Sequence, residues 1–223
     1  MSKNSNELSR LIPWFRKKLL SWFCLEGRHF LWRNKSASKY QVIIAEVLLQ
    51  RTKAETVASF FPKFVKQYPS WKALSLARLP ELKKVLKPIG LWRQRSAVIR
   101  NLSNEMAKRN GRFPKTREDI EKLPGVGQYI ANAILMFCQD QPQPLLDINM
   151  ARVLERFFGP RKLADIRYDP YLQDLARKVL PRKRFKEFNW AILDFASMVC
   201  KSRKPLCKTC CLNTKCLFYT NNP

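Results

Sequence analysis

The sequence contains one histidine, His29, among 223 residues, which excludes histidine-based metal sites and nucleophile–histidine pairs. No segment approaches the ~20 apolar residues that a membrane-spanning helix requires. The apolar run at 43–45 is interrupted by Glu46, and the run from Tyr129 to Cys138 is too short. The first ten residues also lack the apolar core of a signal peptide. We therefore expect no membrane association, and any catalysis must use carboxylates, tyrosines, thiolates or lysines.

Acidic residues are scarce as well. The chain has 17 Asp and Glu against 43 Lys and Arg, which gives a formal net charge of +26. A protein with this charge repels itself unless a polyanion binds it. The basic residues are spread along the whole chain and are not gathered in one membrane-binding block. The composition therefore predicts a nucleic-acid partner.

A chain without a signal peptide is expected in a reducing compartment, here the cytoplasm, so its seven cysteines need an explanation other than disulfides. Four of them form the pattern C-x6-C-x2-C-x5-C near the C-terminus: Cys200, Cys207, Cys210 and Cys216. Four-coordinate metal binding satisfies four thiolates in one short loop, and zinc and a [4Fe–4S] cluster both fit. The remaining three are interpreted as ordinary thiols: Cys24, Cys138 and Cys211.

Apolar residues recur at helical spacing nearly throughout the chain, and no convincing alternating strand pattern occurs. One such helical face consists of Phe188, Ala191, Ile192, Phe195 and Val199. Asp169 and Pro170 predict the beginning of another helix, which Pro181 ends. The sequence therefore predicts an all-α protein of about ten helices.

A glycine-containing hairpin, Leu-Pro-Gly-Val-Gly at 123–127, joins two predicted helices, the second of which begins near Tyr129. Gly125 and Gly127 permit a tight turn and leave backbone N–H groups, with that of Val126 between them, at the N-terminus of the second helix. Such groups bind a phosphate without side chains. A G-x-G alone also fits a plain turn, but the charge of the chain favours a DNA-binding hairpin.

Three carboxylates stand in apolar surroundings. Glu46 lies within Ile43–Leu49, Asp147 lies between Leu146 and Ile148, and Asp194 lies within an apolar helix. A carboxylate in such surroundings destabilises the fold unless it is partnered or used. Asp147 fits either a cap of the following helix or a catalytic group, whereas Asp194 is interpreted as structural.

Together these motifs resemble the endonuclease III and adenine glycosylase branch of the helix-hairpin-helix DNA glycosylases. The resemblance covers about residues 30 to 218 and rests on the segments AEVLLQRT at 45–52, LPGVG at 123–127, LDIN at 146–149 and the cysteine loop. It implies a [4Fe–4S] cluster in preference to zinc, held in a loop at 200–216. It also implies two helical lobes, a six-helix barrel with the hairpin at 38–146 and a second lobe from 1–37 plus 147–223.

The resemblance also implies roles for individual residues in base excision. Asp147 matches the aspartate that supports the water and the cationic sugar while the bond between C1′ and the base nitrogen breaks. Arg51 and Leu91 match positions that fill the gap left by a flipped nucleotide, and Asn149 matches a polar residue beside the aspartate. We therefore expect a monomer that binds double-stranded DNA containing a mismatched or damaged base.

One position distinguishes the members of this branch. The bifunctional lyases carry a lysine two residues after the second hairpin glycine, where this chain has Tyr129, so we expect a monofunctional glycosylase without β-lyase activity. Tyr129 together with Glu46 and Asp147 is similar to the G/T mismatch glycosylases, which remove thymine or uracil opposite guanine. In that role Glu46 would contact the extruded base and help it leave, and Tyr129 would line its pocket.

Two other functions stay open on the sequence alone. An adenine glycosylase acting opposite guanine or oxidised guanine also uses Glu46 and Asp147. Tyr129 argues against it, as does the end of the sequence at Pro223 without the second domain that we expect of that group. A catalytically inactive DNA-binding protein would keep the fold and the cluster, but the presence of both carboxylates argues against this.

Overall fold

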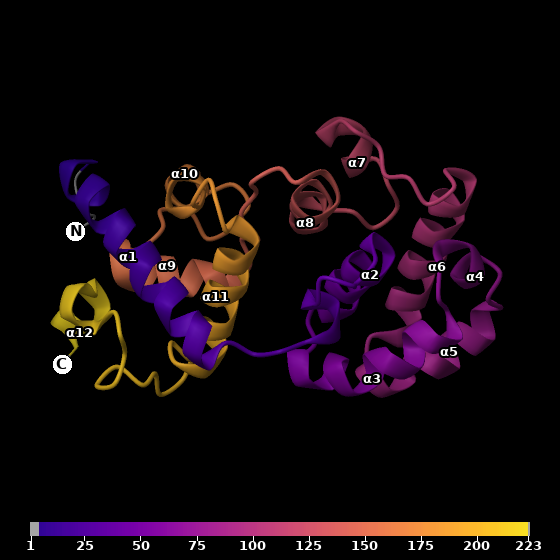
Figure 1. Ribbon diagram of the computed structural model, residues 1–223, viewed down its shortest axis with the longest axis horizontal. Coiled ribbons are helices and arrows are strands. Elements are labelled where there is room, and N and C mark those ends of the chain that lie inside the picture. Colours follow the sequence, from indigo (N-terminus) through magenta and orange to yellow (C-terminus); the bar gives the residue numbers. More distant parts are fainter. Residues whose placement is uncertain (1–4, 223) are drawn as a thin grey trace. The chain divides into compact units, whose positions relative to one another are not determined.

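The computed structural model describes residues 5–222. This part of the chain forms twelve α-helices and three short 3₁₀-helices and contains no β-strand, which confirms the predicted all-α fold (Figure 1). None of these described helices is long and apolar enough to cross a membrane. The chain divides into two compact units, unit 1 with residues 1–28 and 142–223 and unit 2 with residues 29–141.

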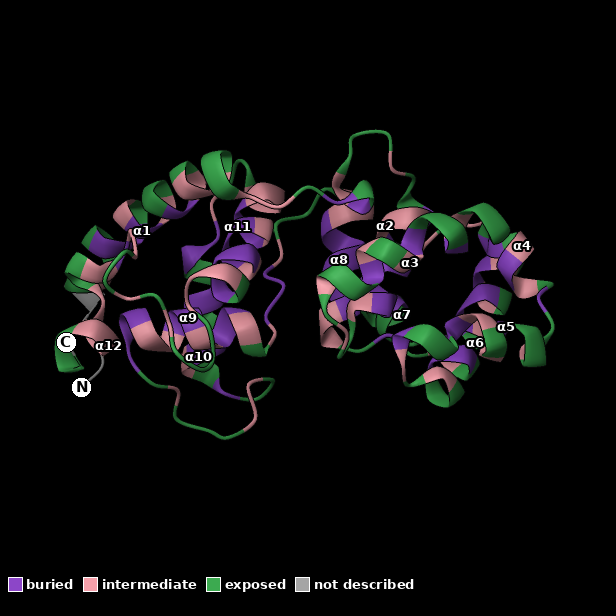
Figure 2. Ribbon diagram, turned by 90° about the horizontal axis from the view of Figure 1, so that it is seen from below, coloured by how far each residue is buried: buried purple, intermediate pink, exposed green. Residues whose placement is uncertain are grey.

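Unit 2, all of whose residues are described, holds seven α-helices and two 3₁₀-helices. In chain order they are η1 (Leu31–Arg33), α2 (Lys39–Leu49), α3 (Ala54–Gln67), α4 (Trp71–Ser75), α5 (Leu79–Leu86), η2 (Lys87–Ile89), α6 (Trp92–Lys108), α7 (Arg117–Glu121) and α8 (Gln128–Gln139). Helices α3, α5 and α6 each have both buried and exposed residues, whereas α2 and α8 are buried or half-buried over almost their whole length (Figure 2). Helix α2 packs against α3 and α8, and α6 packs against α4 and α5.

Helix α2 explains how an acidic residue enters the core of unit 2. It begins at a capping box, in which the Gln41 N–H donates to the Ser38 hydroxyl at 3.2 Å and the Ser38 N–H donates to the Gln41 side chain at 2.8 Å. Six consecutive residues, Ile43–Leu48, are then buried. A helix that is buried all round must carry its one acidic residue, Glu46, into the interior.

Unit 1 combines the first helix of the chain with the C-terminal part. Its described helices are α1 (Ser5–Glu26), α9 (Ile148–Phe158), α10 (Pro170–Val179), α11 (Phe185–Met198), η3 (Asn213–Lys215) and α12 (Leu217–Asn221). Phe15 on α1 packs against Phe157 and Phe158 on α9, with ring centroids 4.8 and 5.0 Å apart. Helix α10 begins as predicted, because Asp169 accepts the Leu172 N–H at 2.7 Å and Pro170 follows it.

The boundaries of the two units lie earlier in the chain than the expected divisions after residues 37 and 146. Trp32 explains the first difference, because its ring packs edge-on against Phe61 of unit 2 at a centroid distance of 5.3 Å. The residues before Asp147 belong to unit 1 because the Leu145 N–H donates to the Asn189 side chain at 2.7 Å and Leu146 lies in the core of unit 1.

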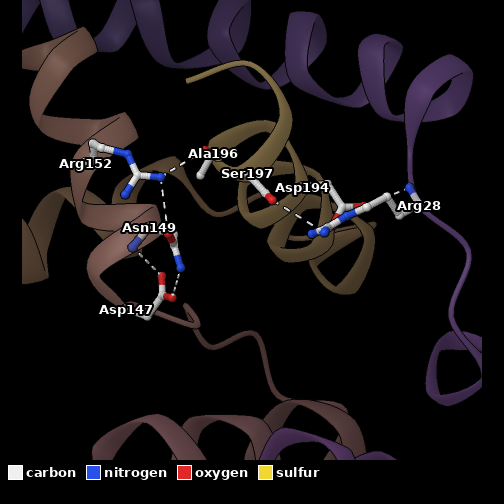
Figure 3. A network of polar contacts seen from close by, with 7 residues as sticks. All are labelled: Arg28, Asp147, Asn149, Arg152, Asp194, Ala196 and Ser197. Atoms are coloured by element: carbon white, nitrogen blue, oxygen red, sulfur yellow. Dashed lines mark hydrogen bonds and ion pairs between the residues drawn. The ribbon is translucent and has the colours of Figure 1, made fainter. Parts of the chain in front are cut away.

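Asp194 has the structural role that its sequence context predicted. Its side chain is fully buried on α11 and accepts the Arg28 backbone N–H at 2.9 Å. It also accepts two hydrogen bonds from the Arg28 guanidinium, at 2.7 and 3.0 Å (Figure 3). This ion pair holds the segment after α1 against α11, so Asp194 stabilises the fold of unit 1.

Candidate active site

Glu46 and Tyr129 are brought together inside unit 2, although 83 positions separate them in the chain. Glu46 lies on α2 and is 3% exposed, whereas Tyr129 lies in the first turn of α8 and is half-buried. The Tyr129 hydroxyl donates a hydrogen bond to Glu46 Oε2 at 2.9 Å. The pair presents a buried carboxylate beside a phenol, which suits an acid or hydrogen-bonding role toward a bound base.

Asp147 lies in unit 1 as the N-cap of α9. Its Oδ1 accepts the N–H groups of Asn149 at 2.9 Å and Met150 at 2.8 Å. Burial raises the pKa of Asp147 above its ordinary value, although these hydrogen bonds oppose the shift. The cap hydrogen bonds favour the anion and burial favours the neutral acid, so the geometry fits both a cap and a catalytic carboxyl group.

Asn149 connects Asp147 to the rest of unit 1. Its Nδ2 donates to Asp147 Oδ2 at 2.6 Å, and its Oδ1 accepts Arg152 Nη2 at 3.2 Å. Arg152 also donates to the backbone oxygens of Ala196 and Cys200, each at 2.9 Å. Figure 3 shows the chain of contacts from Asp147 to Ala196. The carboxylate is therefore held on both oxygens, and its orientation is fixed.

The glycine hairpin joins α7 to α8 as predicted. Gly125 has φ +73°, and a Cβ there would clash with Val98 on α6, so both the backbone and the packing require glycine. Val126 is buried, and its N–H donates to the Leu123 oxygen at 3.1 Å within the turn. Gly127, by contrast, has an ordinary φ of −92°, and a Cβ would meet nothing within 4 Å. Neither the backbone nor the packing of the protein therefore requires glycine at position 127.

Arg51 and Leu91 are two of the six non-glycine residues with a positive φ in the described part of the chain. Both have left-handed φ values, 57° and 51°, which non-glycine residues rarely adopt. Both are exposed in unit 2, and Leu91 precedes α6 directly after Gly90, whose φ is 75°. Strained, exposed residues of this kind are concentrated at functional sites.

The four cysteines of the C-terminal loop line one pocket of unit 1: Cys200, Cys207, Cys210 and Cys216. Cys211 does not line it, and Cys24 is exposed on α1. Arg156 lies at the edge of the pocket and donates to Cys200 Sγ at 3.5 Å. The Leu212 N–H donates to Cys210 Sγ at 3.4 Å. Positive charge and donors at the sulfurs suit a thiolate-bound metal group.

The same four cysteines are not arranged around a single ion. Within residues 5–222 no group of three or more His, Cys, Asp or Glu side chains is placed to hold a metal ion. Burial raises the pKa of Cys207 and Cys216, and it raises the pKa of Cys210 to about 12. These three thiols thus favour the protonated form, and a metal would have to displace their protons.

Sequence reasoning missed two arginines, Arg95, which is buried in unit 2, and Arg152, which is half-buried in unit 1 beside Asn149. Both stand among 43 basic residues, and nothing in the local pattern separates them from solvated ones. The basic charge divides evenly over the chain, with 22 Lys and Arg against 9 Asp and Glu in unit 1 and 21 against 8 in unit 2. Each unit therefore attracts a polyanion by itself.

Known proteins similar to this chain are DNA repair glycosylases. The model of a family described as HhH-GPD superfamily base excision DNA repair protein matches residues 44–181. Thymine-DNA glycosylase of Aeropyrum pernix is 37% identical over 212 residues, which cover 93% of this chain and 95% of that protein. Thymine/uracil-DNA glycosylase of Pyrobaculum aerophilum is 37% identical over 92% of this chain and 91% of its own length. The solved structure of a thermostable thymine-DNA glycosylase is 29% identical, with a TM-score of 0.87 over 96% of this chain and 98% of that one.

Proposed function

Because this chain belongs to the HhH-GPD superfamily of base excision DNA repair proteins and is a DNA glycosylase, we propose that it removes thymine or uracil opposite guanine from double-stranded DNA. The hydrogen bond from Tyr129 to Glu46 carries the proposal. It joins a buried carboxylate to the residue whose position separates the hydrolases of this branch from the lyases. The similarity to thymine and thymine/uracil glycosylases over more than nine tenths of the chain supports the choice of base.

The reaction replaces the bond between C1′ and the base nitrogen by a bond between C1′ and a water oxygen. The target nucleotide must leave the helix, because the bond is out of reach while the base is stacked. Glu46 and Tyr129 would hold the extruded pyrimidine and help it leave with a proton. The ionised Asp147 would stabilise the positive charge on the sugar and orient the water that supplies the hydroxyl group.

Tyr129 also determines what the enzyme leaves behind. A Schiff base with the sugar requires an amine, and a phenol cannot form one. The phenol is already engaged with Glu46. We therefore propose a monofunctional glycosylase that leaves an intact strand with an abasic site.

The hairpin and the flanking loops would bind the DNA. Gly127 leaves open space at the N-terminus of α8, where the helix dipole and the backbone N–H groups favour a phosphate. Arg51 and Leu91 are exposed and would enter the gap left by the extruded nucleotide. The net charge of +26 would add a strong, salt-dependent attraction to the whole duplex.

A [4Fe–4S] cluster is the metal group that the cysteine loop would hold, with Cys200, Cys207, Cys210 and Cys216 as its ligands. The four thiols line one pocket, and the resemblance of this loop to the cysteine loop of the helix-hairpin-helix glycosylases supports a cluster in preference to zinc. When bound, the cluster would fix the fold of the loop. The loop would then present Lys201, Arg203, Lys204 and Lys208 to phosphates.

The test is single-turnover base release from otherwise identical duplexes that carry T, U or A opposite G, with T opposite A as the control. We expect release of T and U opposite G, with strand breaks only after alkali. Release of A would identify an adenine glycosylase, and breaks without alkali would identify a lyase. Binding without release of any base would identify an inactive DNA-binding protein.

A matched pair of variants tests the role of the Glu46–Tyr129 pair. Glu46→Gln removes the charge from the buried carboxylate, and we expect at least a ~100-fold loss of rate. Glu118→Gln removes a carboxylate that is 82% exposed on α7 of the same unit, and we expect no change in the rate. Equal rates for both variants would contradict the proposed role of Glu46.

A further inference from the structure

Arg95, on α6, is a buried basic residue whose charge is met by four hydrogen bonds to uncharged oxygens. Arg95 is only 6% exposed to solvent. Nη1 donates to the backbone oxygens of Ile89 at 3.0 Å and Gly90 at 2.6 Å. Nη2 donates to the Gln50 oxygen at 2.7 Å and to Thr52 Oγ1 at 2.8 Å. One guanidinium thus bridges two loops of unit 2 that lie some forty positions apart in the chain.

The four acceptors surround the two strained residues. Gln50 and Thr52 flank Arg51, and Ile89 and Gly90 directly precede Leu91. Thr52 Oγ1 also donates to the Ile89 oxygen at 3.4 Å, and the Arg95 N–H donates to the Leu91 oxygen at 2.9 Å. Every contact therefore fixes the backbone next to Arg51 or Leu91 and leaves both side chains exposed.

We propose that Arg95 is a positioning residue that clamps Arg51 and Leu91 into a single wedge, which enters the duplex when the target nucleotide is flipped out. This inference rests on the proposed function. Each left-handed residue is costly, and it persists only where its surroundings over-determine it. The clamp supplies that constraint for both residues at once, so that they reach the gap in a fixed mutual position.

Arginine is required at this position by geometry as well as charge. A planar fork reaches two pairs of oxygens on different loops at the same time, whereas a lysine ammonium is a compact point charge on a flexible stem. A buried guanidinium without a carboxylate among its four partners also costs desolvation energy, and stability alone does not favour such a group over a well-packed apolar side chain. A need to hold the two loops together for DNA binding would explain why the protein keeps this buried guanidinium despite its desolvation energy.

The clamp is tested with Arg95→Lys and Arg95→Met, and with Arg100→Met as the matched control. Arg100 lies on the same helix and donates to the Ala77 oxygen, away from both loops. We expect Arg95→Lys and Arg95→Met each to slow single-turnover release of uracil opposite guanine by at least ~10-fold, because small misplacements of positioning groups have large effects on rate. We expect Arg100→Met to change the rate by less than ~2-fold, even where its melting temperature equals that of the Arg95 variants. Equal losses for the two positions would overturn the proposal.

A double-mutant cycle separates the clamp from a general effect on folding. If Arg95 acts through the wedge, Arg95→Lys in a Leu91→Ala, Arg51→Ala background should slow the reaction by less than ~3-fold, because the element that it positions is already absent. If Arg95→Lys instead damaged the fold in general, its rate loss would multiply with the rate loss of the two alanine substitutions. The full ~10-fold loss would then appear in that background. Multiplying effects would therefore refute the clamp.

A second readout does not depend on which base is released. A duplex with an uncleavable abasic-site analogue and a neighbouring 2-aminopurine becomes brighter when a wedge unstacks the helix. We expect the wild-type protein and Arg100→Met to brighten it and Arg95→Lys to give less than half of that change. If the wild-type protein brightens this duplex but releases neither T nor U, the proposed function fails while the clamp stands. If Arg95→Lys brightens it fully, the clamp fails.

Discussion

Replacing Asp147 by asparagine should abolish activity without destabilising the protein. Burial raises the pKa of this carboxyl, so the folded protein binds a proton more tightly than the unfolded chain does. Between the unfolded value of about 3.9 and the folded value, the native state therefore carries more protons, and the free energy of unfolding falls as pH rises through that window. At neutral pH the ionised Asp147 thus lowers stability, and a neutral amide relieves that effect.

The hydrogen bonds that Asp147 accepts as the cap of α9 determine how much each substitution changes the stability of the protein. Asparagine is as good an N-cap as aspartate, so Asp147→Asn keeps an acceptor for the Asn149 and Met150 N–H groups. Its NH2 group then faces Asn149 Nδ2, so the Asn149 amide must rotate to accept from it and give up its 3.2 Å contact with Arg152. Asp147→Ala removes that acceptor and should cost about 1 kcal/mol. For a chain of this size the difference corresponds to a shift in melting temperature of roughly 2–4 °C. Both variants lose the negative charge that stabilises the sugar cation, and we expect each to lose at least about 100-fold in rate.

The assay combines thermal unfolding at pH 7 with single-turnover release of thymine or uracil opposite guanine. We expect Asp147→Asn to melt near the wild-type temperature, because relief of the buried charge offsets the rearranged Asn149 contact, and Asp147→Ala to melt below it. The rate of the wild-type protein should fall as the pH is lowered, because protonation of Asp147 removes the catalytic charge. The apparent pKa of this fall should lie above the ordinary pKa of an aspartate. An Asp147→Asn variant that keeps its rate within about threefold would refute the catalytic role. A variant that melts like Asp147→Ala would refute the account of the cap.

Three further predictions follow from other contacts. Tyr129→Lys supplies the missing amine, so borohydride should trap a covalent complex with DNA, and the absence of trapping would show that this position does not reach the sugar. Asp194→Ala leaves Arg28 half-buried without its carboxylate and should cost about 3 kcal/mol in urea unfolding, with an unchanged rate for the folded fraction; no loss of stability would contradict the structural role. Cys210→Ser should lower bound iron and the absorbance near ~400 nm, whereas Cys211→Ser should retain both; equal spectra would contradict the ligand assignment.

Local sequence signals predicted the features that depend on a few neighbouring residues. The cap at Asp169, the hairpin at 123–127 and the all-helical character were confirmed because capping, glycine conformation and helical periodicity act over one or two turns. The unit boundaries were less predictable. They depend on where Trp32 and Leu146 find their packing partners, and those partners are distant in the chain.

The sequence by itself determined that this is a helical, strongly basic chain with a hairpin, three carboxylates in apolar surroundings and a four-cysteine loop, because composition and spacing carry that information directly. Only the tertiary structure decided which distant groups meet. It paired Tyr129 with Glu46, occupied Asp194 with Arg28, and selected Arg95 from 43 basic residues as the bridge between two strained loops. A long, flexible side chain has no partner written into its local sequence. The fold supplies that partner by burying the side chain beside oxygens that water can no longer satisfy.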